Sequence, residues 1–206
     1  RWSAEPHQVN GTLLHVVDKH ITINSESLTA EIACPLGAHF IDVKDGGTLT
    51  LQNVFIKGGV LAVKDAELLI EDSTLEDVQI TGVAGSEKVA LTVKRSHFRG
   101  TATCEVGTTC IATSRVDFQP SAVTNVEVTV DVALLEGSFW LISATDVLKV
   151  EMLNVTATGF TTADGPTENV KHGIVFHLPN VEAGVFIRHC NFHNNRYIST
   201  HESMSH

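Results

Sequence analysis

An eight-residue pattern recurs seven times along the chain and constrains the fold more than any other feature. Its positions read apolar, any, apolar, any, any, small or apolar, any, apolar. Successive copies start 19, 23, 20, 17, 20 and 37 residues apart, and strand-like repeats of about 20 residues predict a stacked solenoid. The last interval leaves room for one divergent copy. The copies span residues 49–56, 68–75, 91–98, 111–118, 128–135, 148–155 and 185–192.

The spacing inside one copy predicts a strand, a bend and a second strand. In the first copy, Leu49 and Leu51 are two residues apart and therefore share one face of a strand. Val54 falls three residues later, which breaks the period of two, and Ile56 then points inward again. One turn of a parallel β-helix has this form, and its turns stack roughly 4.8 Å apart. We therefore expect Leu51, Ile70 and Val93 to lie one above another.

Alternating residues elsewhere predict further strands, at 13–17, 21–23, 126–130 and 174–176. The longer step between the second and third copies predicts a loop around residues 82–86, and a larger excursion is expected at 161–171. An antiparallel sandwich also has many short strands and is the alternative fold. It does not require the same residue classes at the same positions of successive strands, so the repeat favours the solenoid.

Some short segments resemble known β-helix proteins. The segment Leu49-Thr50-Leu51-Gln52-Asn53-Val54-Phe55 resembles the right-handed parallel β-helix of the pectin-lyase-like superfamily, in which Asn and an aromatic residue follow a strand. The segments 192–195 and 58–61 resemble, more weakly, the Phe-x-x-Asn and Gly-Gly-Ala-Ile units of polymorphic surface adhesins. This resemblance implies an all-β fold, a right-handed parallel β-helix solenoid of about seven or eight coils.

The domain boundaries follow from the repeat. We expect one β-helix domain over residues 1–195, with residues 1–12 capping one end, and a polar C-terminal tail at 196–206. Because the chain opens with Arg1 and not with Met, we expect a processed product or a fragment.

Charge and hydropathy exclude some partners. The formal net charge of −10 and the lack of a basic run argue against nucleic-acid binding. No run of 18 apolar residues exists, so we expect no membrane insertion. The expected partners are protein subunits of the same or a related assembly, with carbohydrate as a second candidate. No cofactor is expected.

Cysteines and glycosylation sequons indicate an extracellular or cell-surface protein. Cys104 and Cys110 bracket a short loop that a disulfide could close, whereas the pairing of Cys34 and Cys190 stays open. Two N-x-Thr triplets make Asn10 and Asn154 candidate glycan acceptors.

The only candidates for catalysis lie near the C-terminus. A polar cluster there could supply an acid, a base and a substrate clamp, but we expect its members to decorate a loop and the outer face of two ordinary coils. It comprises Asp164, Glu168, His172, His177 and Arg188, with His189, His193 and Arg196 nearby. A carboxylate run from Glu67 to Asp77 is expected to be a solvated face. No metal site is predicted, because the histidine and carboxylate spacings match no known ligand order.

These observations favour a non-catalytic, secreted structural or adhesive module. The alternative is a polysaccharide lyase or glycoside hydrolase of the β-helix type, which needs paired carboxylates along a groove. Because one fold hosts many functions, the resemblance alone does not decide between them.

Overall fold

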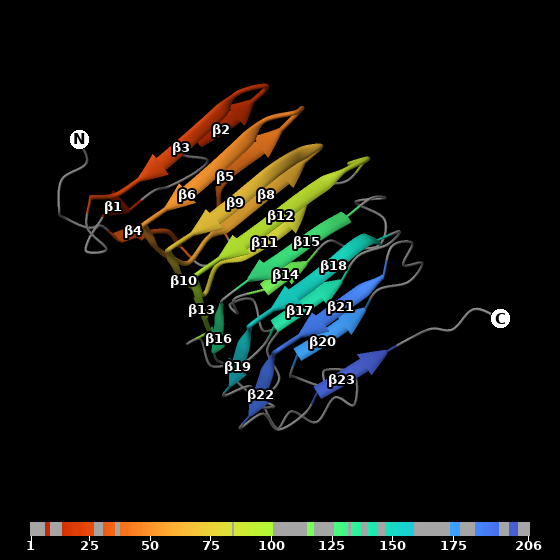
Figure 1. The fold of residues 1–206 in the computed structure, drawn as a ribbon. Coiled ribbons are helices and arrows are strands. Elements are labelled where there is room, and N and C mark those ends of the chain that lie inside the picture. Colours follow the sequence, from red (N-terminus) through yellow and green to blue (C-terminus); the bar gives the residue numbers. More distant parts are fainter. Residues whose placement is uncertain are drawn as a thin grey trace, which may run out of the picture.

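The chain forms three sheets whose strands are all parallel (Figure 1). The computed structural model describes residues 7–8, 14–26, 31–35, 38–83, 85–100, 115–117, 126–131, 133–136, 140–143, 147–158, 174–177, 184–193 and 198–201. These residues contain strands and no helix. Parallel pairing throughout the described sheets is consistent with a parallel β-solenoid, and it contradicts the antiparallel sandwich.

Each strand pairs with the strands three places before and after it in the chain. Sheet A holds β1 (His7–Gln8), β4 (Glu31–Ala33), β7 (Phe55–Lys57), β10 (Thr74–Glu76), β13 (His97–Arg99), β16 (Leu134–Glu136), β19 (Thr156–Thr158) and β22 (Asn191–His193). Sheet B holds β2 (Leu14–Val17), β5 (His39–Lys44), β8 (Val60–Lys64), β11 (Gln79–Gly82), β14 (Arg115–Asp117), β17 (Trp140–Ser143), β20 (Ile174–His177) and β23 (Ile198–His201). Sheet C holds β3 (His20–Asn24), β6 (Thr48–Gln52), β9 (Ala66–Glu71), β12 (Val89–Lys94), β15 (Val126–Asp131), β18 (Val147–Leu153) and β21 (Val185–Arg188).

The predicted columns of inward side chains are confirmed. Leu51 lies beside Ile70, and Ile70 lies beside Val93, with all three side chains fully buried. Apolar residues from all three sheets join in one core cluster. Parallel pairing places like residues beside like residues, so each rung buries the apolar face of its neighbour.

The predicted bend between the two strands of a copy is also confirmed, and its cause is a left-handed residue. Asn53, Asp72 and Arg95 stand between a sheet C strand and the next sheet A strand, with φ angles of 53°, 48° and 46°. Asn154 and His189 repeat this conformation at the same corner further along the stack, each with φ of 53°. Short polar side chains such as Asn and Asp enter this region more readily than others.

The turn from β7 in sheet A to β8 in sheet B uses glycine for a steric reason. Gly59 has a φ of +83°, and a Cβ built there would lie 2.5 Å from Cδ1 of Phe40 and 2.9 Å from Cβ of Cys34. Only glycine fits both the dihedral angle and the space. Cys34 is a free, buried thiol, and burial raises its pKa to about 11.

Three details of the predicted repeat are wrong. Val116 of the fourth copy lies in β14 beside Ile80, in sheet B and not at the corner before a sheet A strand, where Val54 and Ser73 lie at the same position of their copies; the other defined positions of the fourth copy fall outside the described residues. In the sixth copy Val150, not Leu148, lies beside Val128, which shifts the register by two residues. A shift of two keeps the same side chains facing inward, so alternation alone does not reveal it. The last interval hides no further sheet C strand, because β21 pairs directly with β18.

The predicted termini and loops fall partly within the described residues. The expected strands at 13–17, 21–23, 126–130 and 174–176 correspond to β2, β3, β15 and β20. The loop predicted around 82–86 joins β11 to β12, whereas residues 161–171 lie outside the described part of the chain. Within the expected cap, residues 7–8 form β1, and within the expected tail, residues 198–201 form β23.

Candidate functional site

The structure describes only part of the C-terminal polar cluster. Asp164, Glu168 and His172 fall outside the described residues, and His177 is described only through its backbone in β20. Arg188 is exposed in β21, with its guanidinium carbon 5.5 Å from the centre of the Phe186 ring. At that distance the cation interacts with the face of the ring. The described residues therefore bring Arg188 next to an aromatic side chain and not to a catalytic partner.

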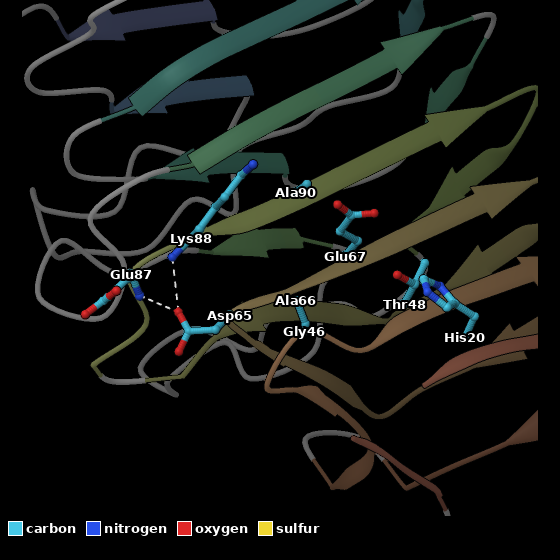
Figure 2. Close-up of a pocket in the computed structure, with 9 residues that line it drawn as sticks. All are labelled: His20, Gly46, Thr48, Asp65, Ala66, Glu67, Glu87, Lys88 and Ala90. Carbon is cyan, nitrogen blue, oxygen red and sulfur yellow. Dashed lines mark hydrogen bonds between the residues drawn. The ribbon is translucent and has the colours of Figure 1, made fainter. Parts of the chain in front are cut away.

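A surface pocket lies elsewhere, at the corner between sheets B and C (Figure 2). Its volume is about 340 Å³. We call it the corner pocket. Its lining consists of His20, Gly46, Thr48, Asp65, Ala66, Glu67, Glu87, Lys88 and Ala90. The sequence did not predict this pocket, because its residues come from four coils and meet only through the strand register.

Asp65 organises one side of the corner pocket. It has a left-handed φ of 47°, and its Oδ1 accepts hydrogen bonds from the backbone N–H groups of Glu87 and Lys88, at 2.5 and 3.1 Å. Lys88 reaches away to Glu127, with 3.6 Å between Nζ and Oε1. The lining is acidic and contains no Phe, Tyr or Trp ring on which a sugar could stack. Two of its charged groups are thus already held by contacts within the protein.

The carboxylate run was expected to be a solvated face, and this is wrong for its second half. Glu76 and Asp77 are buried, at 3% and 7% exposed. Oε1 of Glu76 lies 2.8 Å from Nζ of Lys57, and the same carboxylate also forms an ion pair with the guanidinium of Arg99. Burial raises the pKa of Glu76, but hydrogen bonds from Lys57 and Arg99 and their charges outweigh it, so the pKa lies below its ordinary value. The carboxylate is therefore held in its charged form between two cations.

The first half of the run also forms ion pairs. Asp72 receives two hydrogen bonds from Arg95, both 2.8 Å long, and these hold the pKa of Asp72 below its ordinary value. Glu71 lies 3.8 Å from Lys94 in the next coil. Lys57, Glu76 and Arg99 occupy one column across β7, β10 and β13. Lys57, Glu76 and Arg99 each follow directly after one of the first three copies of the repeat. The predicted register of these copies is correct, so aligning them would have revealed the alternation of basic and acidic residues.

The described residues test few of the predicted modifications. Cys104, Cys110 and Asn10 lie outside them. Cys190 is a free thiol like Cys34, and its Sγ contacts the carbonyl oxygen of Arg188 at 3.3 Å. Asn154 is exposed at its corner, where its backbone N–H donates to the carbonyl of Arg188.

One end of sheet C leaves apolar side chains in solvent. Val185 and Ile187 of β21 are 40% and 43% exposed, whereas their column neighbours Val150 and Met152 are fully buried. Among the described residues, β21 is the last strand of sheet C, while sheets A and B each have one strand more (Figure 1). We call this side of β21 the open edge.

Neither the described side chains nor known proteins identify a reaction. Among the described residues, no group of three or more His, Cys, Asp or Glu side chains could hold a metal ion. No helix in the described part of the chain is both long and apolar enough to cross a membrane. No family model, curated protein or solved structure matches the chain.

Proposed function

We propose that the three sheets are the walls of a single right-handed parallel β-helix of the pectin-lyase-like type. The strand order supports this, because the chain passes through sheets A, B and C in turn and returns to A for each new coil. Right-handed crossovers between parallel strands are by far the commoner hand. Seven to eight coils roughly 4.8 Å apart would form a rod about 35–40 Å long.

The function that the geometry supports best is that of a non-catalytic structural or adhesive module. It would act outside the cell and engage neighbouring protein subunits, or surface glycans, in an assembly. The observation that carries this proposal is the open edge. An uncovered strand edge with aliphatic side chains beside it is a site where another chain can add to the sheet. The exposed sequon at Asn154 is compatible with a secreted protein.

The alternative, a polysaccharide lyase or glycoside hydrolase, would have to use the corner pocket. Three carboxylates line it, which is the kind of group that glycoside hydrolysis needs. However, Oδ1 of Asp65 already accepts hydrogen bonds from two backbone amides, so this carboxylate is engaged within the protein. The corner pocket therefore gives less support to a polysaccharide-cleaving enzyme than the open edge gives to an assembly module.

Two measurements test the proposal. The protein, incubated with acidic and with neutral polysaccharides, should release no reducing ends and no unsaturated products. Sedimentation at a series of concentrations should show a mass that rises with concentration. A polysaccharide product that disappears in Glu67→Gln would overturn the non-catalytic assignment. A single monomeric mass at every concentration would overturn self-assembly.

A further inference from the structure

We propose that Asn154 carries an N-linked glycan at the corner between sheets C and A. This proposal rests on the extracellular location in the function proposed above, and it goes beyond that function by assigning a covalent modification to one side chain. The triplet Asn154-Val155-Thr156 has the acceptor sequence for such a glycan. The fold adds what the triplet alone does not contain, namely where its two reactive side chains lie.

The acceptor side chain supplies the first argument. Asn154 is exposed and lies between β18 and β19 with a left-handed φ of 53°. Its backbone N–H donates to the carbonyl oxygen of Arg188, whereas its side-chain amide makes no hydrogen bond to another described residue. A glycan is bulky and hydrophilic and needs a surface position. A sugar on this amide would therefore break no contact of the described fold and would extend into solvent.

The hydroxyl of the triplet supplies the second argument. Thr156 begins β19, and the next residue of that strand, Ala157, is fully buried in the core. Because successive side chains of a strand point to opposite faces, Thr156 lies on the outer face of sheet A. Its hydroxyl makes no hydrogen bond to another described residue. Both groups that define the acceptor are thus on the surface and unengaged.

An earlier coil provides a natural comparison for residues 154–156. Residues 53–55 occupy the same corner, and both segments begin with an Asn at a φ of 53° whose N–H donates to a carbonyl of the next coil. Both continue with a buried Val. They differ at the third position, where Phe55 and Thr156 lie in the same column of sheet A. The hydroxyl, and not the backbone, therefore distinguishes the acceptor corner from its counterpart.

The modification is a group transfer from a lipid-linked oligosaccharide diphosphate. The side-chain nitrogen of Asn154 forms a bond to C1 of the first sugar, and the bond between C1 and the diphosphate oxygen breaks. The lipid diphosphate leaves with the bonding electron pair, and the amide nitrogen loses one proton. No oxidation or reduction takes place. The secretory pathway of a eukaryotic cell supplies the sugar donor and the transferase, in keeping with the proposed extracellular location.

Expression of the full chain behind a secretion signal in a eukaryotic host tests the proposal. The protein is collected from the medium and from the membranes of the secretory pathway, so that a retained chain is counted as well. An amidase that releases N-linked glycans turns each occupied Asn into Asp, and peptide mass spectrometry then locates it. We expect Asn154 to be occupied. Because occupancy is measured on single peptides, a failure of the proposed self-assembly would leave this result unaffected.

Matched variants decide the outcome. Thr156→Ser keeps the hydroxyl and should keep the glycan, whereas Thr156→Val, which has the same shape without a hydroxyl, should lose it. Phe55→Thr should add a glycan at Asn53, in a column that already contains Thr74. An unmodified Asn154 in the wild type would overturn the proposal, most directly if Asn53 became occupied in Phe55→Thr. A glycan that persists on Asn154 in Thr156→Val would overturn it as well.

Discussion

At the scale of single residues, Glu76 is the most deeply buried of the described carboxylates. Its side chain is 4% exposed, while those of Lys57 and Arg99 are 51% and 42% exposed. If Glu76 is replaced, the charged groups of Lys57 and Arg99 can still be solvated. If the two cations are replaced, the carboxylate of Glu76 stays buried without solvent. The carboxylate is therefore the member of this trio whose hydrogen bonds matter most to the fold.

We predict that Glu76→Gln lowers the free energy of unfolding by about 1–3 kcal/mol, because it removes a buried acceptor of charged donors. As the control, Glu127→Gln breaks the exposed ion pair with Lys88 and should change the free energy of unfolding by less than about 0.5 kcal/mol. Urea denaturation at neutral pH measures both. Equal effects of the two substitutions would contradict this reading.

The pH dependence of the same variant has a defined sign. The pKa of Glu76 is lower in the folded state than its ordinary value, so its contribution is complete above the ordinary glutamate pKa of about 4.3. The contribution is lost as the pH falls through the lower, folded value. The difference in stability between wild type and Glu76→Gln should therefore narrow in acid. A difference that stays constant down to pH values below about 4 would show that Glu76 acts through packing.

At the scale of elements, the corners decide where strands stop, and Asp65 illustrates this best. It is the single residue between β8 and β9, and it also accepts hydrogen bonds from the loop that leads into β12. One side chain thus links two successive coils at the rim of the corner pocket.

We predict that Asp65→Gly loosens this loop without unfolding the stack, because glycine keeps the left-handed backbone but removes the acceptor. Hydrogen exchange at the amides of Glu87 and Lys88 should accelerate at least about tenfold, which corresponds to the loss of a hydrogen bond to a charged group. Asp65→Asn keeps an oxygen acceptor and should retain most of the protection. Identical exchange in the two variants would rule out the proposed role of the side chain.

The sequence predicted elements well where the apolar pattern was regular, and less well elsewhere. The rungs through Leu51, Ile70 and Val93 were aligned correctly because two strands and a bend had to match together. The pattern did not distinguish a sheet B strand from the bend and strand that follow sheet C, because inward apolar residues occur in both, and this misplaced Val116. The corner pocket and the buried state of Glu76 depend on contacts between coils, which no single copy of the repeat contains.

At the scale of the whole molecule, position along the stack decides how much a side chain contributes. Ile70 and Ile187 belong to the same column of sheet C, but Ile70 is fully buried and Ile187 is 43% exposed. Interior rungs are covered on both sides, whereas β21, the last described rung of sheet C, is covered on one.

We predict that Ile70→Ala lowers the free energy of unfolding by about 2–5 kcal/mol, the usual range for a large-to-small change in a packed core. Ile187→Ala should cost less than about 1 kcal/mol, because much of that side chain is already in water. Chemical denaturation of both variants makes the comparison. If the two changes had the same effect, the last rung would have to be covered in solution.

The register of sheet C has a consequence for how such a scaffold can diversify. A single residue joins β8 to β9, whereas residues 83–88 join β11 to β12, and yet Val89 lies beside Ala66. β14 ends at Asp117 and β15 begins at Val126, which again lies beside Val89. Extra sequence inserted at this corner leaves the interior unchanged. The corner is therefore a natural graft point, where foreign epitopes could be displayed on an unaltered frame.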